Sequence, residues 1–580
     1  MFNHNLLSNP SSPSGFGRVN KWVVFCLLTL VVFAVFGRTI WFDYVQLDEG
    51  ILLVNNDFFI SKIANFTEVF QHDINYPSAV APYYRPIFIL SFMLNSQFDK
   101  LMAGQINSTS LFYHIGNILL HIVASFLIFG LLRELGVKRI ASILFSVLFA
   151  VHPAATPVVA WVPGRLEAIL TIFMLLSFIM FVRFLRTSNW RYLVGFFLSF
   201  AAAIFTKEVA ISLLPVLLFY YLIHRQEKGS EMLVTFLSGL AGICIAWFFV
   251  RRNIMAGVQV SDLSFYQVLV ALWSNSLAVF LYLGKTLLPF NLTVLPILES
   301  SRLVYGFIIL AVLALYWFFG KIKILSLGAL GIIWFLAFLA LSLVSYNLPE
   351  RMVFFEHRLY LPLIGIFIFF GSSDLVQRLD FKKLKNLIPA LAVIILFSIT
   401  SFNYGSVYKD KMTFWQKAVA DSPKLSEAHN GLATAYLMDG KMAEAEAEFV
   451  TTVELNPTEK RVHLLLGLYY LNQGQYDKAK EKFEKEIQID PEQFVAYHGL
   501  GRLYAQSNNL KEAEISFLKT LELNADYVLA RQDLVVLYFS QNKHPQAVAQ
   551  LKELLKIQQP EAMHPQILKI LEIYRKESSL

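Results

Sequence analysis

Long apolar runs separated by short polar segments follow one another from Lys21 to about Asn403, and the chain is polar and charged from Tyr404 onward. Each run approaches the ~20 residues that an α-helix needs to cross a bilayer. Because backbone N–H and C=O groups must find partners inside lipid, many such runs predict a bundle of membrane-spanning helices. We predict about eleven spans, which begin near Trp22, Leu111, Ile140, Glu167, Trp190, Val209, Glu231, Leu303, Ile324, Leu359 and Leu387.

Two further apolar segments do not fit this count. Residues 87–98 are too short to cross a bilayer comfortably. Residues 265–290 are long enough, but counting them as a span would invert the orientation of the later loops. We interpret both segments as re-entrant or interfacial helices.

The polar C-terminal part contains an internal repeat. The prolines Pro423, Pro457 and Pro491 recur with the 34-residue period of tetratricopeptide (TPR) repeats. The same spacing relates Tyr436, Tyr470, Tyr504 and Tyr538; Ala445, Ala479, Ala513 and Ala547; Phe449, Phe483, Phe517 and Leu551; and the turn residues Gly440, Gly474, Asn508 and Asn542. This pattern predicts four helix–turn–helix units, whose concave surface would bind a peptide or protein. A structural spacer is the alternative.

Composition agrees with a membrane protein. Of the 580 residues, 56% are hydrophobic and 16% are charged, whereas soluble proteins carry about 25% charged residues. Cys26 and Cys244 both lie in apolar runs, so structural disulfides are not expected. The net charge of +7 is better explained by membrane topology than by nucleic-acid binding.

Basic residues predict the orientation, because short cytoplasmic loops collect Lys and Arg. Arg18 and Lys21 place the N-terminus inside, and an odd number of spans places the repeats outside. The chain is therefore expected to be all-α, a polytopic helical membrane domain followed by a TPR α-solenoid. The expected parts are a disordered cytoplasmic N-terminus (1–20), a polytopic membrane domain (21–404), a linking helix (405–422) and four TPR repeats with a capping helix (423–580).

The segments predicted to lie outside carry many charged residues. Charges next to apolar runs are costly and are usually functional or paired. A carboxylate there can act as a general base on an acceptor hydroxyl, and arginines can bind a phosphate through two hydrogen bonds. The pattern indicates group transfer from a phosphate-bearing lipid. The candidate residues are Asp48, Glu49, Arg85, His152, Arg165, Glu167, Lys207, Glu208, Glu356, His357, Arg358 and Tyr360.

Several candidates also have ordinary structural explanations. Lys207 and Glu208 are adjacent and could cap a loop, and His152 precedes a proline and could end a helix. Asp48 and Glu49 could belong to a solvated loop. Carboxylates in that loop could bind a divalent metal ion, although no spacing requires one.

The order and spacing of the charged segments resemble the TMTC family, the transmembrane TPR-containing O-mannosyltransferases of the GT-C glycosyltransferase superfamily. The resemblance covers nearly all of the chain after Lys21. The matching pieces are LDEG (Asp48, Glu49), YYRP (Tyr84, Arg85), FYHIGNILLH (His114, Asn117, His121), LFAVHP (His152), GRLEAI (Arg165, Glu167), FTKE (Lys207, Glu208) and EHRLYLPLIG (Glu356, Arg358, Tyr360). Two departures are Pro157, where the family commonly has an acid, and an array shorter than that of animal members, which favours a bacterial member.

The resemblance implies a sugar donor carried on dolichyl or polyprenyl phosphate, and transfer to a Ser or Thr hydroxyl of a protein bound in the TPR groove. It implies Asp48 as the catalytic carboxylate, supported by Glu49. The implied ligands of the donor phosphate are Arg85, Arg165, Lys207 and Arg358. The expected location is a bacterial inner membrane with a periplasmic array, or the endoplasmic reticulum membrane with a lumenal array.

Two other classes of function compete with an enzyme. A transporter or flippase-like protein with a docking array would use the same charges for passage, and some of them would lie at mid-depth. Such a protein would also be expected to show internal repeats and broken helices. A scaffold would need far fewer spans. The sugar, the acceptor, the lipid length and the oligomeric state stay open.

Overall fold

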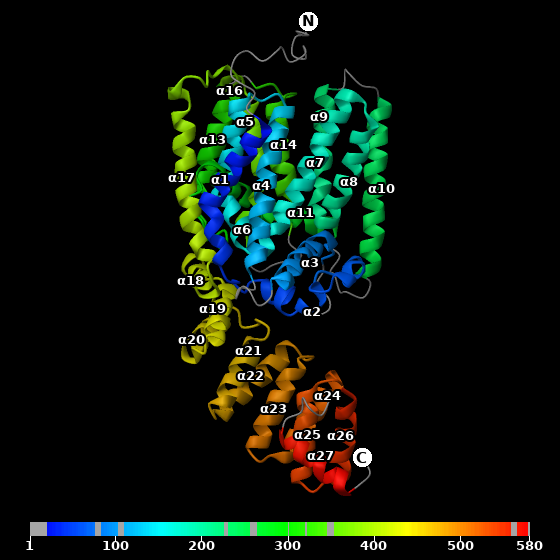
Figure 1. Cartoon of the computed structure of the whole chain (residues 1–580). Helices are drawn as coiled ribbons and strands as arrows, with labels where there is room; N and C mark the ends of the chain where they lie inside the picture. Colours follow the sequence, from blue (N-terminus) through cyan, green and yellow to red (C-terminus); the bar gives the residue numbers. More distant parts are fainter. Residues whose placement is uncertain are drawn as a thin grey trace. The chain divides into compact units, whose positions relative to one another are not determined.

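The structure is a computed structural model that describes residues 20–75, 83–102, 110–224, 230–255, 264–299, 301–319, 322–344, 353–557 and 565–577. The predicted disordered N-terminus lies outside these ranges, apart from Asn20. Within them the chain is all-α, as predicted, and contains no strand. It divides into two compact units, Met1–Ser422 and Pro423–Leu580 (Figure 1).

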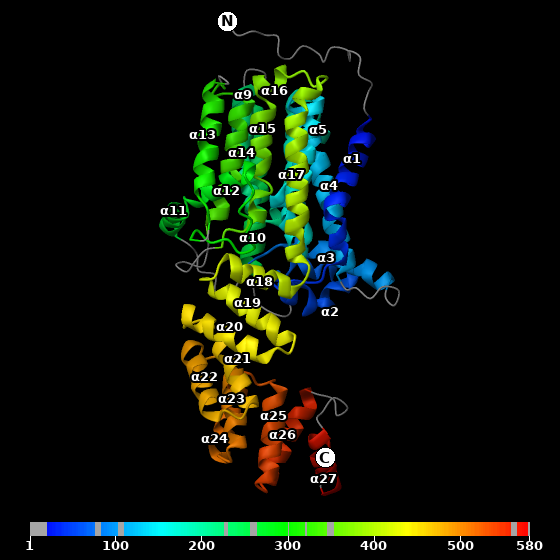
Figure 2. The ribbon, with the colours of Figure 1, turned by 90° about the vertical axis from the view of Figure 1, so that its left-hand side faces the viewer.

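The first unit is a bundle of apolar helices that run alongside one another, as Figure 1 and Figure 2 show. Its helices are α1 (Lys21–Phe36), α2 (Asp57–Ile60), α3 (Pro86–Leu101), α4 (Leu111–Glu134), α5 (Arg139–Ala150), α6 (Thr156–Ala160), α7 (Arg165–Thr187), α8 (Trp190–Thr206), α9 (Leu213–His224), α10 (Ser230–Ile254), α11 (Phe265–Ser274), α12 (Ala278–Leu287), α13 (Val304–Phe319), α14 (Leu327–Ala340), α15 (Leu363–Gly371), α16 (Asp374–Arg378), α17 (Ile388–Gly405) and α18 (Lys411–Asp421).

Five helical segments of the described chain are long and apolar enough to cross a membrane, or up to seven if each of two bent pairs is one span. The bent pairs are α5 with α6, at 51°, and α11 with α12, at 50°. Each predicted span begins at or near one of the apolar helices. Length and composition thus support an integral membrane protein, while the count of about eleven stays a prediction.

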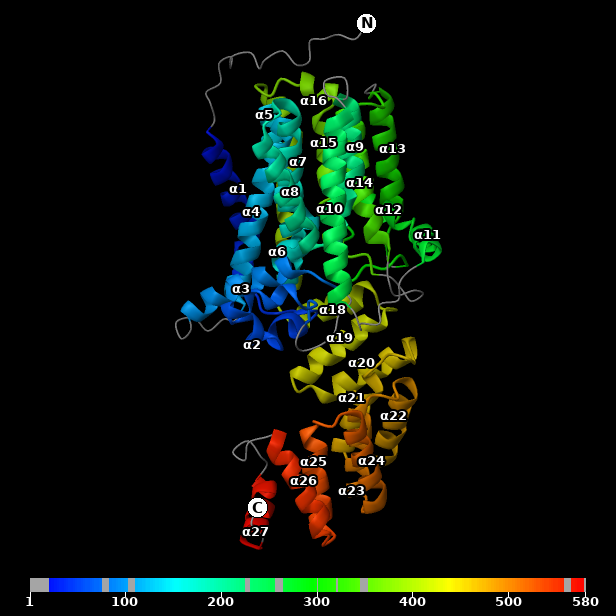
Figure 3. The same cartoon turned by 90° about the vertical axis from the view of Figure 1, so that its right-hand side faces the viewer.

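The two ends of the bundle differ. Helices α2 and α3 lie across one end, and α16 lies at the opposite end, in all the views including Figure 3. Residues 87–98, which we interpreted as re-entrant or interfacial, belong to α3. Lys138 Nζ donates a hydrogen bond of 3.2 Å to the carbonyl of Leu379. This bond joins the basic segment at the start of α5, which includes Lys138 and Arg139, to the basic segment that follows α16, which includes Lys382 and Lys383.

Helices α14 and α15 cross in close contact through a pair of glycines. A β-carbon at Gly331 would clash with the Gly365 carbonyl oxygen, and one at Gly365 would clash with the Gly331 carbonyl oxygen. Small residues let helix backbones approach in membranes, where van der Waals packing drives association. This crossing holds α14 against α15, the helix that follows the loop around residue 356.

Replacing Gly331 by alanine should push α14 away from α15. The clash is with backbone, which cannot swing aside, so we expect a loss of about 1–3 kcal/mol of stability, as for other overpacked sites. Thermal unfolding of the detergent-solubilised chain measures it. Gly242→Ala in α10 is the matched control, because nothing lies within 4 Å of the added β-carbon. Equal melting temperatures for the two variants would contradict this packing.

The second unit confirms the predicted repeat. Its helices are α19 (Ser426–Met438), α20 (Met442–Leu455), α21 (Val462–Asn472), α22 (Tyr476–Ile489), α23 (Phe494–Gln506), α24 (Leu510–Leu523), α25 (Val528–Ser540), α26 (His544–Ile557) and α27 (Pro565–Glu577). The first eight form four consecutive pairs. The turn residues Gly440, Gly474, Asn508 and Asn542 all have φ between 57° and 74°. Glycine adopts this left-handed backbone most readily and asparagine more readily than most other residues, which explains the turn series.

Candidate functional site

A cavity of about 340 Å³ lies in the first unit, where the segments that connect its helices meet. It is lined by several of the predicted residues, namely Asp48, Arg85, Glu167, Lys207, Glu208, His357 and Arg358. These residues lie far apart in the sequence. The fold therefore brings the acid-containing first loop together with the later basic segments.

Helix ends explain how the charged side chains reach the cavity. Arg85 is the N-cap of α3, and Glu167 lies in the first turn of α7. Lys207 ends α8 with an extended backbone, and the short helix η7 (Glu208–Ser212) follows directly. Arg358 lies on the short helix η10 (Glu356–Leu359). These charges thus lie at the start or end of a helix or on a short helical segment between longer ones, where a polar side chain is tolerated best.

Two ion pairs neutralise most of the charge on the cavity wall. Arg85 Nη2 lies 2.9 Å from Glu208 Oε1. The neighbouring Lys207 pairs instead with Glu167. Lys207 and Glu208 therefore do more than cap a loop, because their partners come from α7 and from the start of α3.

Two charged side chains on the cavity wall, Asp48 and Arg358, belong to neither of these ion pairs. Among the described residues, no cation lies within ion-pair distance of Asp48 and no carboxylate within ion-pair distance of Arg358. Arg358 Nη1 donates to the Ser342 carbonyl at 3.0 Å, and its guanidinium lies 5.5 Å from the centre of the Phe355 ring. The cavity thus offers a free carboxylate and a partly free guanidinium to whatever enters it.

The surroundings of Asp48 favour the protonated carboxyl more than water does. Desolvation raises the pKa of Asp48 to about 6, although the positive charge of Arg85 acts in the opposite direction. Glu49 is buried, and its carboxylate accepts hydrogen bonds from the backbone N–H groups of Leu47 and Asp48 at 3.1 and 3.3 Å. Glu49 therefore shapes the loop that presents Asp48, and it does not line the cavity.

The loop of Asp48 is also held by α18. The backbone N–H of Asp43 donates to the Lys409 carbonyl at 2.9 Å. The indole N–H of Trp415 donates to the Val45 carbonyl at 3.0 Å. The linking helix thus supports one wall of the cavity.

The structure does not bring every predicted residue to the cavity. Arg165 is fully buried, and its guanidinium donates to Asn117, Asn95, Ser91 and Tyr113. With these partners it organises the start of α7, and it has no exposed face for a donor phosphate.

The three remaining candidates are buried next to partners of their own. His152 lies 3.1 Å from the carbonyl of Thr286, and Tyr360 contacts His121 at 2.7 Å. Glu356 binds Lys285 at 2.6 Å.

The prediction from sequence missed two residues of this region. Lys285 is a single charge within the apolar helix α12, which is itself a signal of a buried partner. Trp161 lines the cavity, and its ring centre lies 5.4 Å from that of His357. No sequence pattern distinguishes Trp161 from other tryptophans at a membrane interface. In the described part of the chain, no cluster of three or more His, Cys, Asp or Glu side chains could hold a metal ion.

Comparison with known families gives matches in both units. Residues 100–255 match the family model of dolichyl-phosphate-mannose-protein mannosyltransferases. Residues 461–493 and 495–527 match tetratricopeptide repeat models.

Curated proteins with similar sequences include protein O-mannosyl-transferases. The chain is 23% identical to human TMTC3 over 489 residues, which cover 76% of this chain and 52% of that protein. It is 36% identical to Tmtc1 of Drosophila melanogaster over 131 residues, 23% of this chain and 14% of that one. The chain thus spans about half the length of the human relative. Among solved structures, MamA of Desulfovibrio magneticus RS-1 matches 26% of this chain and 86% of its own, with 17% identity and a TM-score of 0.25.

Proposed function

We propose that this chain, a TMTC-like protein, is a membrane glycosyltransferase of the GT-C type that acts on proteins. It moves a sugar from a polyprenyl or dolichyl phosphate to a Ser or Thr hydroxyl. The observation that carries the proposal is the pairing of charges in the cavity. Once Arg85 and Lys207 are neutralised, Asp48 and Arg358 remain for the reaction.

In the proposed step, the acceptor hydroxyl oxygen attacks the anomeric carbon of the sugar. Its proton passes to the carboxylate of Asp48, which acts as general base. The bond between the anomeric carbon and the phosphate oxygen breaks, and its electron pair stays on the lipid phosphate. The Arg358 guanidinium offsets the negative charge that develops there.

We further propose that the cavity opens on the outside and that the TPR unit binds the acceptor. The basic loops that lie together near Lys138 and Leu379 support an inside location for that end of the bundle. A concave helical array is suited to holding an extended peptide. The protein would then lie in a bacterial inner membrane with the array in the periplasm, or in an endoplasmic reticulum membrane with a lumenal array.

Sugar transfer by the reconstituted full chain tests the function. Proteoliposomes receive polyprenyl-phosphate mannose or glucose with a radiolabelled sugar, together with a mixture of secreted acceptor proteins. We expect label in protein and release of polyprenyl phosphate. Movement of the labelled lipid across the bilayer without any labelled protein would favour the transporter.

The rate of transfer should depend on pH through Asp48. Its pKa of about 6 means that the carboxylate is ionised above that pH and protonated below it. The base must be ionised, so the rate at saturating donor should rise with pH to a plateau above about pH 7. Initial rates between about pH 5 and about pH 8 measure this. A profile that is flat across this range would contradict Asp48 as the base.

A further inference from the structure

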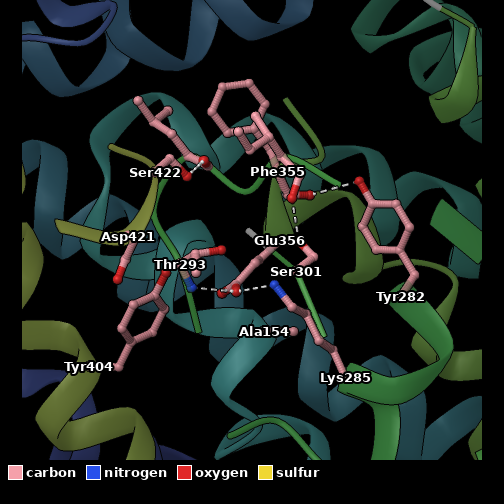
Figure 4. Close-up of polar contacts among 12 residues, drawn as sticks. Ala154, Tyr282, Lys285, Thr293, Ser301, Phe355, Glu356, Tyr404, Asp421 and Ser422 are labelled. Atoms are coloured by element: carbon pink, nitrogen blue, oxygen red, sulfur yellow. Dashed lines mark hydrogen bonds and ion pairs between the residues drawn. The ribbon is translucent and has the colours of Figure 1, made fainter. Parts of the chain in front are cut away.

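A second buried charge cluster lies beside the cavity, around Glu356 (Figure 4). Glu356 Oε1 lies 2.6 Å from Lys285 Nζ and accepts a hydrogen bond of 2.9 Å from the backbone N–H of Thr293. Glu356 is 3% exposed and Lys285 is 4% exposed. None of the three residues lines the cavity or takes part in the step proposed above.

The contacts hold three consecutive residues of one short segment. The backbone N–H of Phe354 donates to the Pro296 carbonyl at 2.7 Å. The Phe355 carbonyl accepts from the hydroxyl of Tyr282 at 3.2 Å (Figure 4). The third residue, Glu356, is held by the ion pair of its side chain with Lys285 of α12. Since Tyr282 and Lys285 are three residues apart on α12, they project from the same face of that helix.

The segment held in this way leads directly into the cavity wall. His357 and Arg358 follow Glu356 on η10 and line the cavity. Because the side chain of Glu356 is held in place, the start of η10 is fixed. The direction from which the Arg358 guanidinium enters the cavity is therefore fixed as well. Groups that must meet a reacting atom need this kind of rigid support, since small misplacements cost large factors in rate.

The ion pair is poorly explained by stability alone. Burying two charges costs desolvation, and a well-packed apolar pair is often as stable or more so. In the described part of the chain, the second oxygen of Glu356 and the hydroxyl of Thr293 have no hydrogen-bond partner, which adds to the cost of burial. We propose that Glu356 and Lys285 are positioning residues that set the geometry of Arg358 for the lipid phosphate. This inference rests on the proposed function.

The other side of the cluster is fixed by the end of α18. Ser422 Oγ donates a hydrogen bond of 2.8 Å to the Leu295 carbonyl. The segment 293–296 is therefore held between η10 and α18. Asp421 and Glu356 are each paired with a lysine, Lys417 and Lys285, so the cluster is close to neutral and does not call for a bound cation.

Binding of polyprenyl phosphate without sugar tests the inference. The ligand's effect on the melting temperature of the solubilised full chain gives a half-saturating concentration that does not depend on transfer. In Glu356→Gln we expect this concentration to rise about tenfold, which corresponds to ~1.4 kcal/mol, because Arg358 no longer meets the phosphate well. The donor KM in the transfer assay should rise by a similar factor. Lys285→Arg keeps a positive charge beside Glu356, so its half-saturating concentration and donor KM should lie closer to the wild-type values than those of Glu356→Gln.

Controls separate positioning from folding. Glu134→Gln, at the last residue of α4, removes two other ion pairs, those with Arg183 at 2.5 Å and Arg186 at 3.2 Å. Both arginines lie near the end of α7 that is remote from the cavity residue Glu167. This variant should lower the melting temperature without changing half-saturation. If Glu356→Gln does not fold, the double variant Glu356→Gln with Lys285→Met leaves no unpaired charge and should show the same tenfold rise.

Three outcomes decide the inference. A folded Glu356→Gln or double variant with unchanged half-saturation overturns the positioning role. Wild-type chain that neither binds polyprenyl phosphate nor transfers sugar overturns the proposed function instead. A variant with a lower melting temperature but the wild-type donor KM assigns the ion pair to stability and overturns the inference.

Discussion

Asp48→Asn should lower the rate of sugar transfer by about 10²- to 10⁴-fold, the contribution that a positioned general base makes to proton transfer. The amide keeps the shape of the side chain but cannot accept the acceptor's proton. Polyprenyl phosphate binding should stay unchanged, because Arg358 is untouched. Initial rates at saturating donor, together with the thermal-shift titration, separate the two effects.

Asp57→Asn provides the control for this variant. Asp57 is exposed at the first position of α2, in the same loop region, and does not line the cavity. Its substitution should leave the rate within a factor of about two, as is usual for exposed positions. Full transfer by Asp48→Asn would show that the base is another group.

Arg358→Gln should lower the transfer rate by about 10²- to 10³-fold, which is the cost of removing one preorganised donor from a developing anion. It should also raise the half-saturating concentration of polyprenyl phosphate. Arg358→Lys should recover only part of the loss, because a guanidinium presents two parallel donors to a phosphate and an ammonium does not. The same two assays measure both quantities.

Arg302→Gln is the corresponding control. Arg302 is an exposed arginine, and among the described residues the one hydrogen-bond partner of its side chain is the hydroxyl of Tyr305, at 3.4 Å. The variant removes a positive charge without touching the cavity, so transfer and binding should stay at wild-type values. Wild-type binding by Arg358→Gln would place the donor phosphate elsewhere.

The helices and the repeats could be predicted from the sequence, because each of them has a recurring pattern of residues. The turn residues Gly440 and Asn542, for example, have the positive φ that their residue types indicate. For the first bend, the sequence offered a helix end at His152, before Pro153, but not the change of direction. The break between α5 and α6 lies around Pro153, inside a run that hydropathy reads as one span. Hydropathy measures composition over a window, so it does not resolve a change of direction.

The candidate site was predicted in its residue types but not in its pairing. Asp48, Lys207 and Arg358 do line one cavity. Arg165 has the same charge and a similar sequence context, yet it is buried among hydrogen-bond partners. Which arginine is free depends on side chains brought in from distant helices, such as Asn117 for Arg165. A single sequence carries no record of those contacts.

The hydrogen bonds of α18 determine where a junction could be placed if the repeat array were exchanged for that of a related protein. Trp415 holds the loop of Asp48, and Ser422 holds the segment that supports Glu356. The helix is therefore part of the first unit, although it follows the last apolar helix and has the composition of a linker. The compact repeat unit starts at Pro423. A recombination event or a designed graft with its junction after Gly405 would carry away supports of both walls of the cavity, whereas one after Ser422 would leave them in place.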